Sequence, residues 1–381
     1  MARQAVIIVK SIYMDNAAST KIKPEVLKTF NKIAKKLYAN PSSEHVEGLK
    51  AEKCINNVKE DIISKKINCE PDEIFFTTGA TMSNNLFIQG MLRKHPETMF
   101  ITSTVEHNDI MMLYDWLPYT KRLVDVRKNG IVDICQLTKY IEECADKGIP
   151  CLVSIQMANS ETGIIQPIKL ISDILHLYKY GYLHVDATQY IPYYTIDVKE
   201  MEIDALSMSG QKIGGIKGSG LLYVRQVIQN DISPIIFGEQ GLIGGTPSTP
   251  LIASLGDAFN RIGDLDIIDL QNKRNYLLSR LQDLGGILVG TKDNRLPNNI
   301  YIRFSGINGW TLMNLLNEMN IYIGTGSACS TSLNEPSHVA MAYGLSKEEA
   351  LECIRFTLSN DNTYEEIDYV INTLKSILPL L

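Results

Sequence analysis

The stretch Leu-His-Val-Asp-Ala-Thr-Gln, residues 183–189, joins a short apolar run to a cluster of polar side chains. Similar apolar runs recur between residues 74 and 224 and alternate with segments of helical spacing. This alternation indicates an α/β fold, in which mostly parallel strands are connected by helices on both faces of the sheet. The expected strands are Ile74–Thr77, Met99–Thr102, Cys151–Met157, Leu183–Val185, Ala205–Met208 and Leu221–Val224.

Polar side chains follow four of these strands at the point where each strand ends. Ligands of parallel sheets bind outside the carboxyl ends of the strands. We therefore expect a common site at this edge of the sheet. The residues concerned are Thr78-Gly79-Ala80-Thr81, His107, Asn159 and Glu161, and Asp186 and Gln189.

The chain changes character around Gly244-Gly245-Thr246-Pro247. A long helical segment at about 250–286 follows. It leads to expected strands at Asn299–Phe304 and Ile321–Ile323 and expected helices at 309–319 and 346–357. We expect a large domain over 13–255 and a smaller α+β domain over 256–381, with which the N-terminal segment 1–30 can pack.

Composition narrows the class of protein. The chain has 381 residues, of which 45% are hydrophobic and 21% charged, as is ordinary for a soluble globular protein. A net charge of −6 and the lack of a basic run with interleaved aromatics argue against nucleic acid as a direct ligand. No apolar run approaches the roughly 18 residues of a membrane span. Seven irregularly spaced cysteines without a C-x-x-C pair predict no disulfide framework, no metal site and a reducing cytoplasm.

Two strand ends suit a phosphorylated aromatic ligand. Phe76–Asn85 reads as a strand, a glycine turn and a helix start whose free N–H groups suit a phosphate, although an ordinary helix cap would look the same. Ser209 can add a donor. Beside a pyridine ring, Asp186 would keep the ring nitrogen protonated and Gln189 would donate to a phenolic oxygen, whereas a helix-capping aspartate is the alternative.

A lysine and a cysteine complete this pattern. Lys212 lies in a Gly/Ser-rich turn, residues 207–220, where its amine can form a Schiff base with an aldehyde cofactor. Cys329 lies in Gly-Thr-Gly-Ser-Ala-Cys-Ser-Thr-Ser, residues 324–332, and its thiol can attack whatever that cofactor activates. Together they indicate pyridoxal-phosphate chemistry coupled to a nucleophilic cysteine. The alternative is that Cys329 is a buried core residue.

His107 and Arg355 are further candidates. An imidazole at His107 can stack on a flat cofactor and relay protons near neutral pH, but a lone histidine is more often structural. Arg355 sits among apolar neighbours and needs an anion. A substrate carboxylate would suit its fork of donors, and a structural salt bridge would serve equally well.

Taken in order, these motifs closely resemble the cysteine desulfurases of the class V aminotransferase family, in the branch with a long cysteine loop. The resemblance runs from Tyr13 to Leu358. It implies a fold-type I pyridoxal-phosphate enzyme with a mostly parallel, seven-stranded sheet. The most specific elements are Asn40-Pro41-Ser42-Ser43, Ala80-Thr81, Glu106-His107, His184-Val185-Asp186-Ala187, Lys212 with Lys217-Gly218, and Gly326-Ser327-Ala328-Cys329.

The resemblance also implies roles. L-cysteine would become L-alanine while Cys329 takes the sulfur as a persulfide. Lys212 would hold pyridoxal 5'-phosphate and His107 would stack on its ring as acid or base. The other implied cofactor contacts are Ala80, Thr81, Ser209 and Gln211, Thr246 toward the neighbouring subunit's cofactor, and Asp186, Gln189 and Ser160; Arg355 and Asn159 would bind substrate.

A homodimer follows from the role of Thr246, and the sulfur would pass to an acceptor protein for iron–sulfur clusters or thio-modified tRNA. The chain departs from the family pattern in several places, yet the residues central to the chemistry remain. A related class V lyase or aminotransferase, including a selenocysteine lyase, is the alternative, followed by a non-catalytic scaffold. The departures are Gln211 for a histidine, Ser160 for an asparagine, Ile243 and Gln240 for arginines, and Met82 for an acidic residue.

Overall fold

The computed structural model describes residues 11–238, 241–326 and 335–381, which form two compact units. The large unit comprises Ser19–Asn159 and Ile164–Leu265. The small unit comprises the described part of Met1–Ala18 together with Ser160–Gly163 and Asp266–Leu381. A short segment from the middle of the chain thus belongs to the same unit as the C-terminal third. Cys329 lies outside the described residues.

The large unit is built on a seven-stranded sheet, which confirms the predicted mostly parallel α/β architecture. Only β8 runs antiparallel to its neighbours. β4, whose sequence Lys-Arg-Leu-Val carries two charges at the edge of the sheet, was not expected. The strand order is β2 (Ile74–Thr77), β8 (Gly220–Val224), β7 (Ala205–Ser209), β6 (Gly181–Asp186), β5 (Cys151–Gln156), β3 (Met99–Ser103) and β4 (Lys121–Val124).

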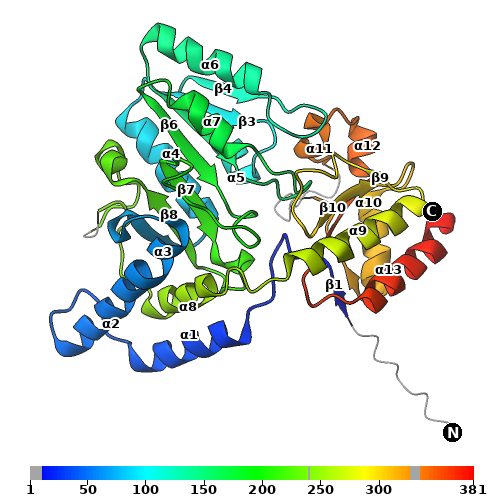
Figure 1. Ribbon diagram of the computed structural model, residues 1–381, viewed down its shortest axis with the longest axis horizontal. Coiled ribbons are helices and arrows are strands. Elements are labelled where there is room, and N and C mark those ends of the chain that lie inside the picture. The colour runs from blue at the N-terminus through cyan, green and yellow to red at the C-terminus, as the bar shows by residue number, and fades with distance from the viewer. Residues whose placement is uncertain (1–10, 239–240, 327–334) are drawn as a thin grey trace. The chain divides into compact units, whose positions relative to one another are not determined.

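Helices cover both faces of this sheet (Figure 1). The inner strands are largely apolar because side chains of both faces are buried. In β5, for example, Leu152 joins the core beneath α4 and α5, while Val153 joins the core on the other face. The helices are α1 (Pro24–Lys36), α2 (Val46–Asn57), α3 (Ser64–Ile67), α4 (Ala80–Lys94), α5 (Asn108–Trp116), α6 (Ile134–Lys147), α7 (Ile168–Leu175) and α8 (Thr249–Asn260).

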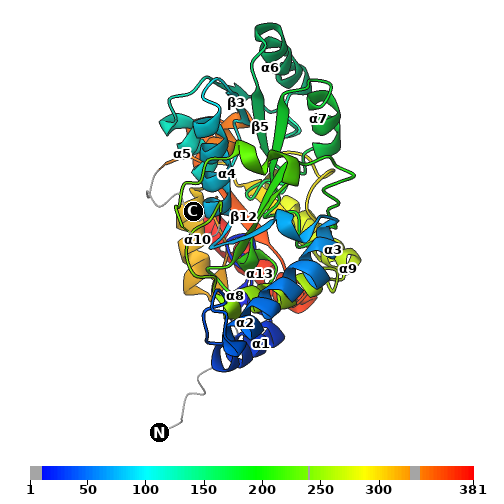
Figure 2. The same cartoon turned by 90° about the vertical axis from the view of Figure 1, so that its left-hand side faces the viewer.

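The direction of the strands sets the place of the site. β2 and β7 both pair antiparallel with β8, so they run in the same direction as each other. β6, β5 and β3 follow β7 in parallel. The carboxyl ends of these five strands therefore meet at one edge of the sheet, as the sequence predicts. The view turned by 90° shows the same strands from the side (Figure 2).

The small unit contains a three-stranded antiparallel sheet and a short parallel pair. In the sheet, β10 (Asn299–Arg303) lies between β12 (Cys353–Thr357) and β9 (Ile287–Leu288). The pair joins β1 (Ile12–Tyr13) to β11 (Ile321–Tyr322) and ties the start of the described chain to this unit. The helices are α9 (Ile267–Asp283), α10 (Gly309–Glu318), α11 (His338–Ala342), α12 (Lys347–Leu351) and α13 (Tyr364–Ile377).

The prediction of one helix over 346–357 was wrong. A helix does begin after Ser346, but it ends at Leu351 and β12 follows. The sequence Cys-Ile-Arg-Phe-Thr pairs with all of β10 and is buried throughout, so tertiary pairing decided its structure. The expected helix over 250–286 is likewise two helices, separated near Gly263, whose φ of +105° suits glycine.

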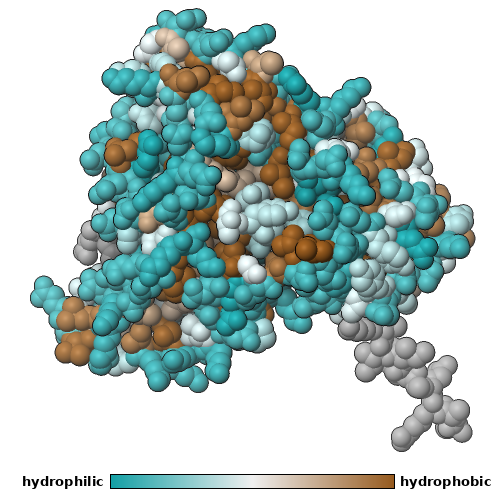
Figure 3. Space-filling view, in the orientation of Figure 1, coloured by the Kyte–Doolittle hydropathy of each residue, from teal (hydrophilic) through white to brown (hydrophobic). Residues whose placement is uncertain are grey.

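Apolar side chains gather in these cores, and the face drawn in Figure 3 is mostly hydrophilic with separate hydrophobic patches. Within the described residues, no helix is long and apolar enough to cross a membrane.

Candidate functional site

The turn between β2 and α4 is packed closely against the end of β7. Gly79 precedes α4 with φ +153°, a conformation that side chains disfavour. A Cβ on Gly220 would lie 2.5 Å from the Cα of Gly79, so both positions need glycine. Ala80, the first residue of α4, donates its backbone N–H to Ser209 Oγ at 2.8 Å. The helix start, with Thr81 as its second residue, and the end of β7 thus form one surface.

Asp186 ends β6 and is 7% exposed. Its Oδ1 accepts the backbone N–H of Thr188 at 3.0 Å, and its Oδ2 accepts a hydrogen bond from Asn84 Nδ2 at 3.1 Å. Burial raises the pKa of Asp186, and the neighbouring Asp109 raises it further. The carboxyl therefore holds a proton more readily than an exposed aspartate does, and a cationic N–H placed beside it would favour its ionised, accepting form.

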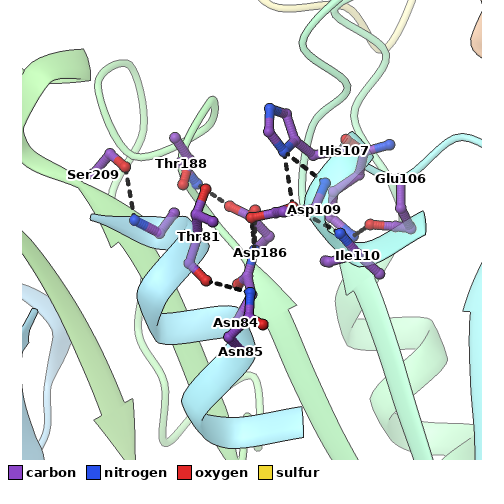
Figure 4. A network of polar contacts seen from close by, with 12 residues as sticks. Thr81, Asn84, Asn85, Glu106, His107, Asp109, Ile110, Asp186, Thr188 and Ser209 are labelled. Atoms are coloured by element: carbon purple, nitrogen blue, oxygen red, sulfur yellow. Dashed lines mark hydrogen bonds and ion pairs between the residues drawn. The ribbon is translucent and has the colours of Figure 1, made fainter. Parts of the chain in front are cut away.

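His107 occupies the N-cap position of α5 and contacts Asp109, two residues later. His107 Nδ1 lies 2.8 Å from Asp109 Oδ1, and Asp109 Oδ2 accepts from Asn84 Nδ2 at 3.2 Å. Because Asn84 also reaches Asp186, the four side chains form a continuous polar network across three elements (Figure 4).

Glu106 lies beneath this network and is fully buried. It accepts hydrogen bonds from Ser103 Oγ at 2.5 Å and from the backbone N–H of Gln156 at 2.8 Å. Burial raises the pKa of Glu106 to about 8, against the two hydrogen bonds, which lower it; Asp186 and Asp109 raise it as well. At neutral pH, Glu106 is therefore mainly protonated.

Lys212 follows β7 at the end of a 3₁₀ turn, Gly210–Lys212. Lys212 is half-buried, whereas Lys217 in the same loop is exposed, so the structure distinguishes the two amines. The adjacent Gln211 is also half-buried, and its carbonyl accepts the N–H of Thr20 at 3.2 Å. Gln189 follows Asp186 in a turn and is half-buried.

Asn159 and Thr246 differ in surroundings. Asn159 is 1% exposed, and its Nδ2 donates to the carbonyl of Val105 at 2.9 Å, which ties it to the loop that carries His107. Thr246 is exposed and lines a pocket of about 410 Å³ together with Thr78, Ile243 and the β2 strand. Ile243 thus contributes an apolar wall to that pocket.

Arg355 lies on β12 in the small unit and is 1% exposed. Its Nη1 donates to the carbonyl of Ser160 at 2.9 Å and its Nη2 donates to Asp15 Oδ1 at 2.7 Å. Ser160 belongs to the short segment of the small unit. Glu161, next in the chain, accepts a hydrogen bond from Ser337 Oγ at 2.5 Å.

The structure therefore brings Ala80, Ser209, Asp186 and His107 together in the large unit and Ser160 with Arg355 in the small unit. The sequence reading missed Asn84 and Asp109, which link His107 to Asp186. Asp109 was detectable as an acid two residues after a helix-capping histidine. Asn84 lies one turn into α4, on the face of Ala80. No cluster of three or more potential metal ligands occurs among the described residues.

Comparison with known proteins places the chain in a family. Residues 12–370 match the model of the family "Aminotransferase class-V". The chain is 36% identical to the cysteine desulfurase IscS of Clostridium botulinum, over 97% of this chain and 94% of that protein. It is 34% identical to the mitochondrial cysteine desulfurase of Saccharomyces cerevisiae, over 98% of this chain and 76% of that protein.

Solved structures agree. A NifS-like protein superimposes with a TM-score of 0.89 at 30% identity, covering 98% of this chain and all of that one. SspA in complex with cysteine superimposes with a TM-score of 0.80 at 32% identity, over 93% of this chain and 100% of that one. The chain therefore belongs to the class V aminotransferase family, in which its relatives are cysteine desulfurases.

Proposed function

We propose that this chain is a pyridoxal-phosphate-dependent cysteine desulfurase that converts L-cysteine to L-alanine and moves the sulfur to Cys329. The observation that carries the proposal is the combination of full-length relatives of that name with Lys212 and Asp186 at the ends of neighbouring strands. β6 and β7 pair directly, so the two side chains emerge from the same edge of the sheet.

The residues present fit pyridoxal phosphate. The cofactor has an aldehyde, a ring nitrogen and a phosphate. The edge offers a half-buried amine at Lys212, a buried carboxyl with a raised pKa at Asp186, and the N-terminus of α4 beside the Ser209 hydroxyl. A helix N-terminus binds phosphate through its free N–H groups and its dipole. When bound, the cofactor supplies an electron sink next to the substrate's α-carbon.

Each residue of the large unit then has a task. Lys212 would hold the cofactor through its amine, which could also carry a proton. Asp186 would hold the proton of the ring nitrogen, Gln189 would donate to the phenolic oxygen, and His107 would stack on the ring and exchange protons. The phosphate is bound by Ala80, Thr81, Ser209 and Gln211 of one chain and Thr246 of the other chain of a homodimer.

Substrate binding falls to Arg355 and to Asn159, which Ser160 follows in the sequence. The guanidinium of Arg355 is held by Asp15 and the carbonyl of Ser160, while its Nε has no hydrogen-bond partner among the described residues. That buried donor can be satisfied by the carboxylate of cysteine.

The sulfur step uses Cys329. Its Sγ, as the thiolate, attacks the sulfur of the substrate, so that a new S–S bond forms while the substrate's C–S bond breaks. The electron pair of the broken bond is protonated at the β-carbon. One cysteine and one Cys329 thiol thus yield one alanine and one Cys329 persulfide, with no external oxidant.

An acceptor protein must then take the persulfide sulfur, for iron–sulfur cluster assembly or for tRNA thiolation. Free thiols are needed throughout, which fits the cytoplasm; the described cysteines are all unpaired. Among the departures, Gln211 can still donate to phosphate but brings no charge, and Ile243 leaves an apolar wall where a cation is usual. We propose that they change the rate and the choice of acceptor rather than the reaction.

The test is alanine formation by the purified protein loaded with pyridoxal phosphate. L-cysteine should yield equal amounts of alanine and sulfide when a thiol reductant recycles Cys329. L-selenocysteine and a panel of other amino acids separate this activity from that of a selenocysteine lyase or an aminotransferase. Cofactor binding without turnover of any amino acid would favour the non-catalytic scaffold and overturn the proposal.

A further inference from the structure

We propose that Asp109 is a positioning residue of this site: its carboxylate fixes the proton of His107 on Nδ1 and, through Asn84, couples His107 to Asp186. The inference deepens the proposed function, on which it rests only for the identity of the reaction. Its structural basis is the network drawn in Figure 4, in which Asp109 lies between the imidazole and the amide.

The first step concerns the contact with His107. Although burial raises the pKa of Asp109, hydrogen bonds and the charge of His107 outweigh burial and lower it overall. Asp109 is therefore an ionised carboxylate with only acceptors to offer. The 2.8 Å between its Oδ1 and His107 Nδ1 is a hydrogen bond only if Nδ1 carries the proton.

A competing contact is weaker. The backbone N–H of Asp109 also points at His107 Nδ1, at 3.4 Å. Both contacts cannot be hydrogen bonds at once, because one ring nitrogen cannot accept and donate together. The shorter contact, to a full negative charge, is the stronger, so Nδ1–H is favoured. Nε2 is then the nitrogen that can gain or lose a proton.

The second step concerns Asn84. Its single –NH₂ group donates to Asp109 Oδ2 at 3.2 Å and to Asp186 Oδ2 at 3.1 Å. Because Asp109 and Asp186 both present acceptor oxygens to Asn84, the amide nitrogen faces them and the amide oxygen, Oδ1, points away. This Oδ1 has no hydrogen-bond partner among the described residues. The amide thereby ties the position of Asp109 to that of Asp186.

The third step concerns the charges of the titratable groups around Asp109. Four titratable groups interact electrostatically with Asp109: His107 just before α5, Glu106 on the same loop, and Asp186 and His184 on β6. Glu106 is mainly protonated at neutral pH, and burial lowers the pKa of His184 to about 3, so neither carries charge. Asp109 thus adds a second negative charge beside Asp186 and favours protonation both at His107 and at Asp186.

A purely structural role for Asp109 is the rival explanation. Its Oδ1 also accepts the N–H of Ile110 at 2.8 Å, as a helix-capping side chain would. Asp109→Asn separates the two roles, because asparagine retains an oxygen for the cap but loses the charge. Asp115→Asn is the matched control, since Asp115 lies on the same helix and is exposed.

The decisive measurement is ¹⁵N NMR of the histidine rings in the cofactor-free protein, with His107→Gln used to assign the signals. In the parent protein, neutral His107 should carry its proton on Nδ1. In Asp109→Asn the preference for that tautomer should weaken, because an amide oxygen is a weaker acceptor than a carboxylate, and the midpoint of the ring titration should fall by about one pH unit or more. Asp115→Asn should match the parent.

The loaded enzyme gives a second readout. Asp109→Asn should lower kcat for alanine formation about tenfold or more with little change in KM, and should move the pH profile. A parent His107 with the proton on Nε2, or an Asp109→Asn protein with an unchanged ring titration, would overturn the proposal. If Asp109→Asn does not fold, the parent tautomer alone decides. Because the NMR result needs no turnover, it stands apart from any failure of the desulfurase assay.

Discussion

Arg355 Nη2 donates to Asp15 Oδ1 at 2.7 Å, and both residues lie in the small unit. The Arg355 side chain is 2% exposed, so an unpaired guanidinium there would be costly. The sequence left two roles open for Arg355, a structural ion pair and a substrate anchor. The structure shows that the ion pair exists, while the unpartnered Nε leaves capacity for a second anion.

Arg355→Lys should separate these roles. Lysine keeps the charge and can pair with Asp15, but it lacks the separate Nε donor that Arg355 has left over for a second anion. We expect KM for L-cysteine to rise about tenfold or more, as for the loss of a charged hydrogen bond of about 1.5–3 kcal/mol. Steady-state kinetics measure KM, and urea unfolding monitors stability. Lower stability with an unchanged KM would leave Arg355 with the structural role alone.

Lys212→Ala should abolish covalent attachment of the cofactor, because the only change is the loss of the amine that forms the bond. We expect the absorbance near 400 nm, as for lysine-bound pyridoxal phosphate, and all turnover to be lost. Lys217→Ala is the matched control, since Lys217 is exposed in the same loop. Loss of the absorbance in Lys217→Ala with retention in Lys212→Ala would reverse the assignment.

Glu106→Gln should change how stability depends on pH. In the folded protein, the pKa of Glu106 is about 8, above its ordinary value of 4.5, so the folded state retains a proton that the unfolded state has released. Glu106 therefore makes the parent lose stability as pH rises from about 4.5 to about 8.

Each pKa unit corresponds to about 1.4 kcal/mol. As pH rises through this range, the parent should therefore lose a few kcal/mol of unfolding free energy relative to Glu106→Gln. Urea unfolding of the cofactor-free proteins at several pH values measures it. Glu142→Gln, at an exposed position on α6, is the control and should run parallel to the parent. If the unfolding free energy of Glu106→Gln also ran parallel to that of the parent across these pH values, the raised pKa of Glu106 would be contradicted.

Cys329→Ser should retain the cofactor and bind cysteine but form no persulfide, since a serine hydroxyl is too weak a nucleophile for the sulfur. In the parent, activity should follow a thiol-like ionisation, because the thiolate is the attacking form. Alanine release, trapping of protein persulfide and the pH profile measure these effects. Normal sulfur transfer by Cys329→Ser would rule out the proposed mechanism.

The sequence was most informative where a local pattern of residues determines the secondary structure or the place of the site. Period and length of the apolar runs predict the parallel strands, and the polar residue after each run predicts the edge at which they meet, as for Asp186 and His107. β4 was not predicted from the sequence, because its charged edge sequence lacks an apolar run. Cys353–Thr357 was read as helix because its β-structure depends on pairing with β10.

Sequence alone therefore determined which residue types stand at the strand ends and which family the chain resembles, because both depend on order along the chain. Tertiary structure decided what those residues touch. Asn84 and Asp109 are 25 residues apart in the sequence, and Arg355 and Asp15 are 340 residues apart, so no local sequence pattern predicts either contact. The charge, protonation and orientation of the site depend on such contacts, since they arise from burial and from neighbours that only the folded chain brings together.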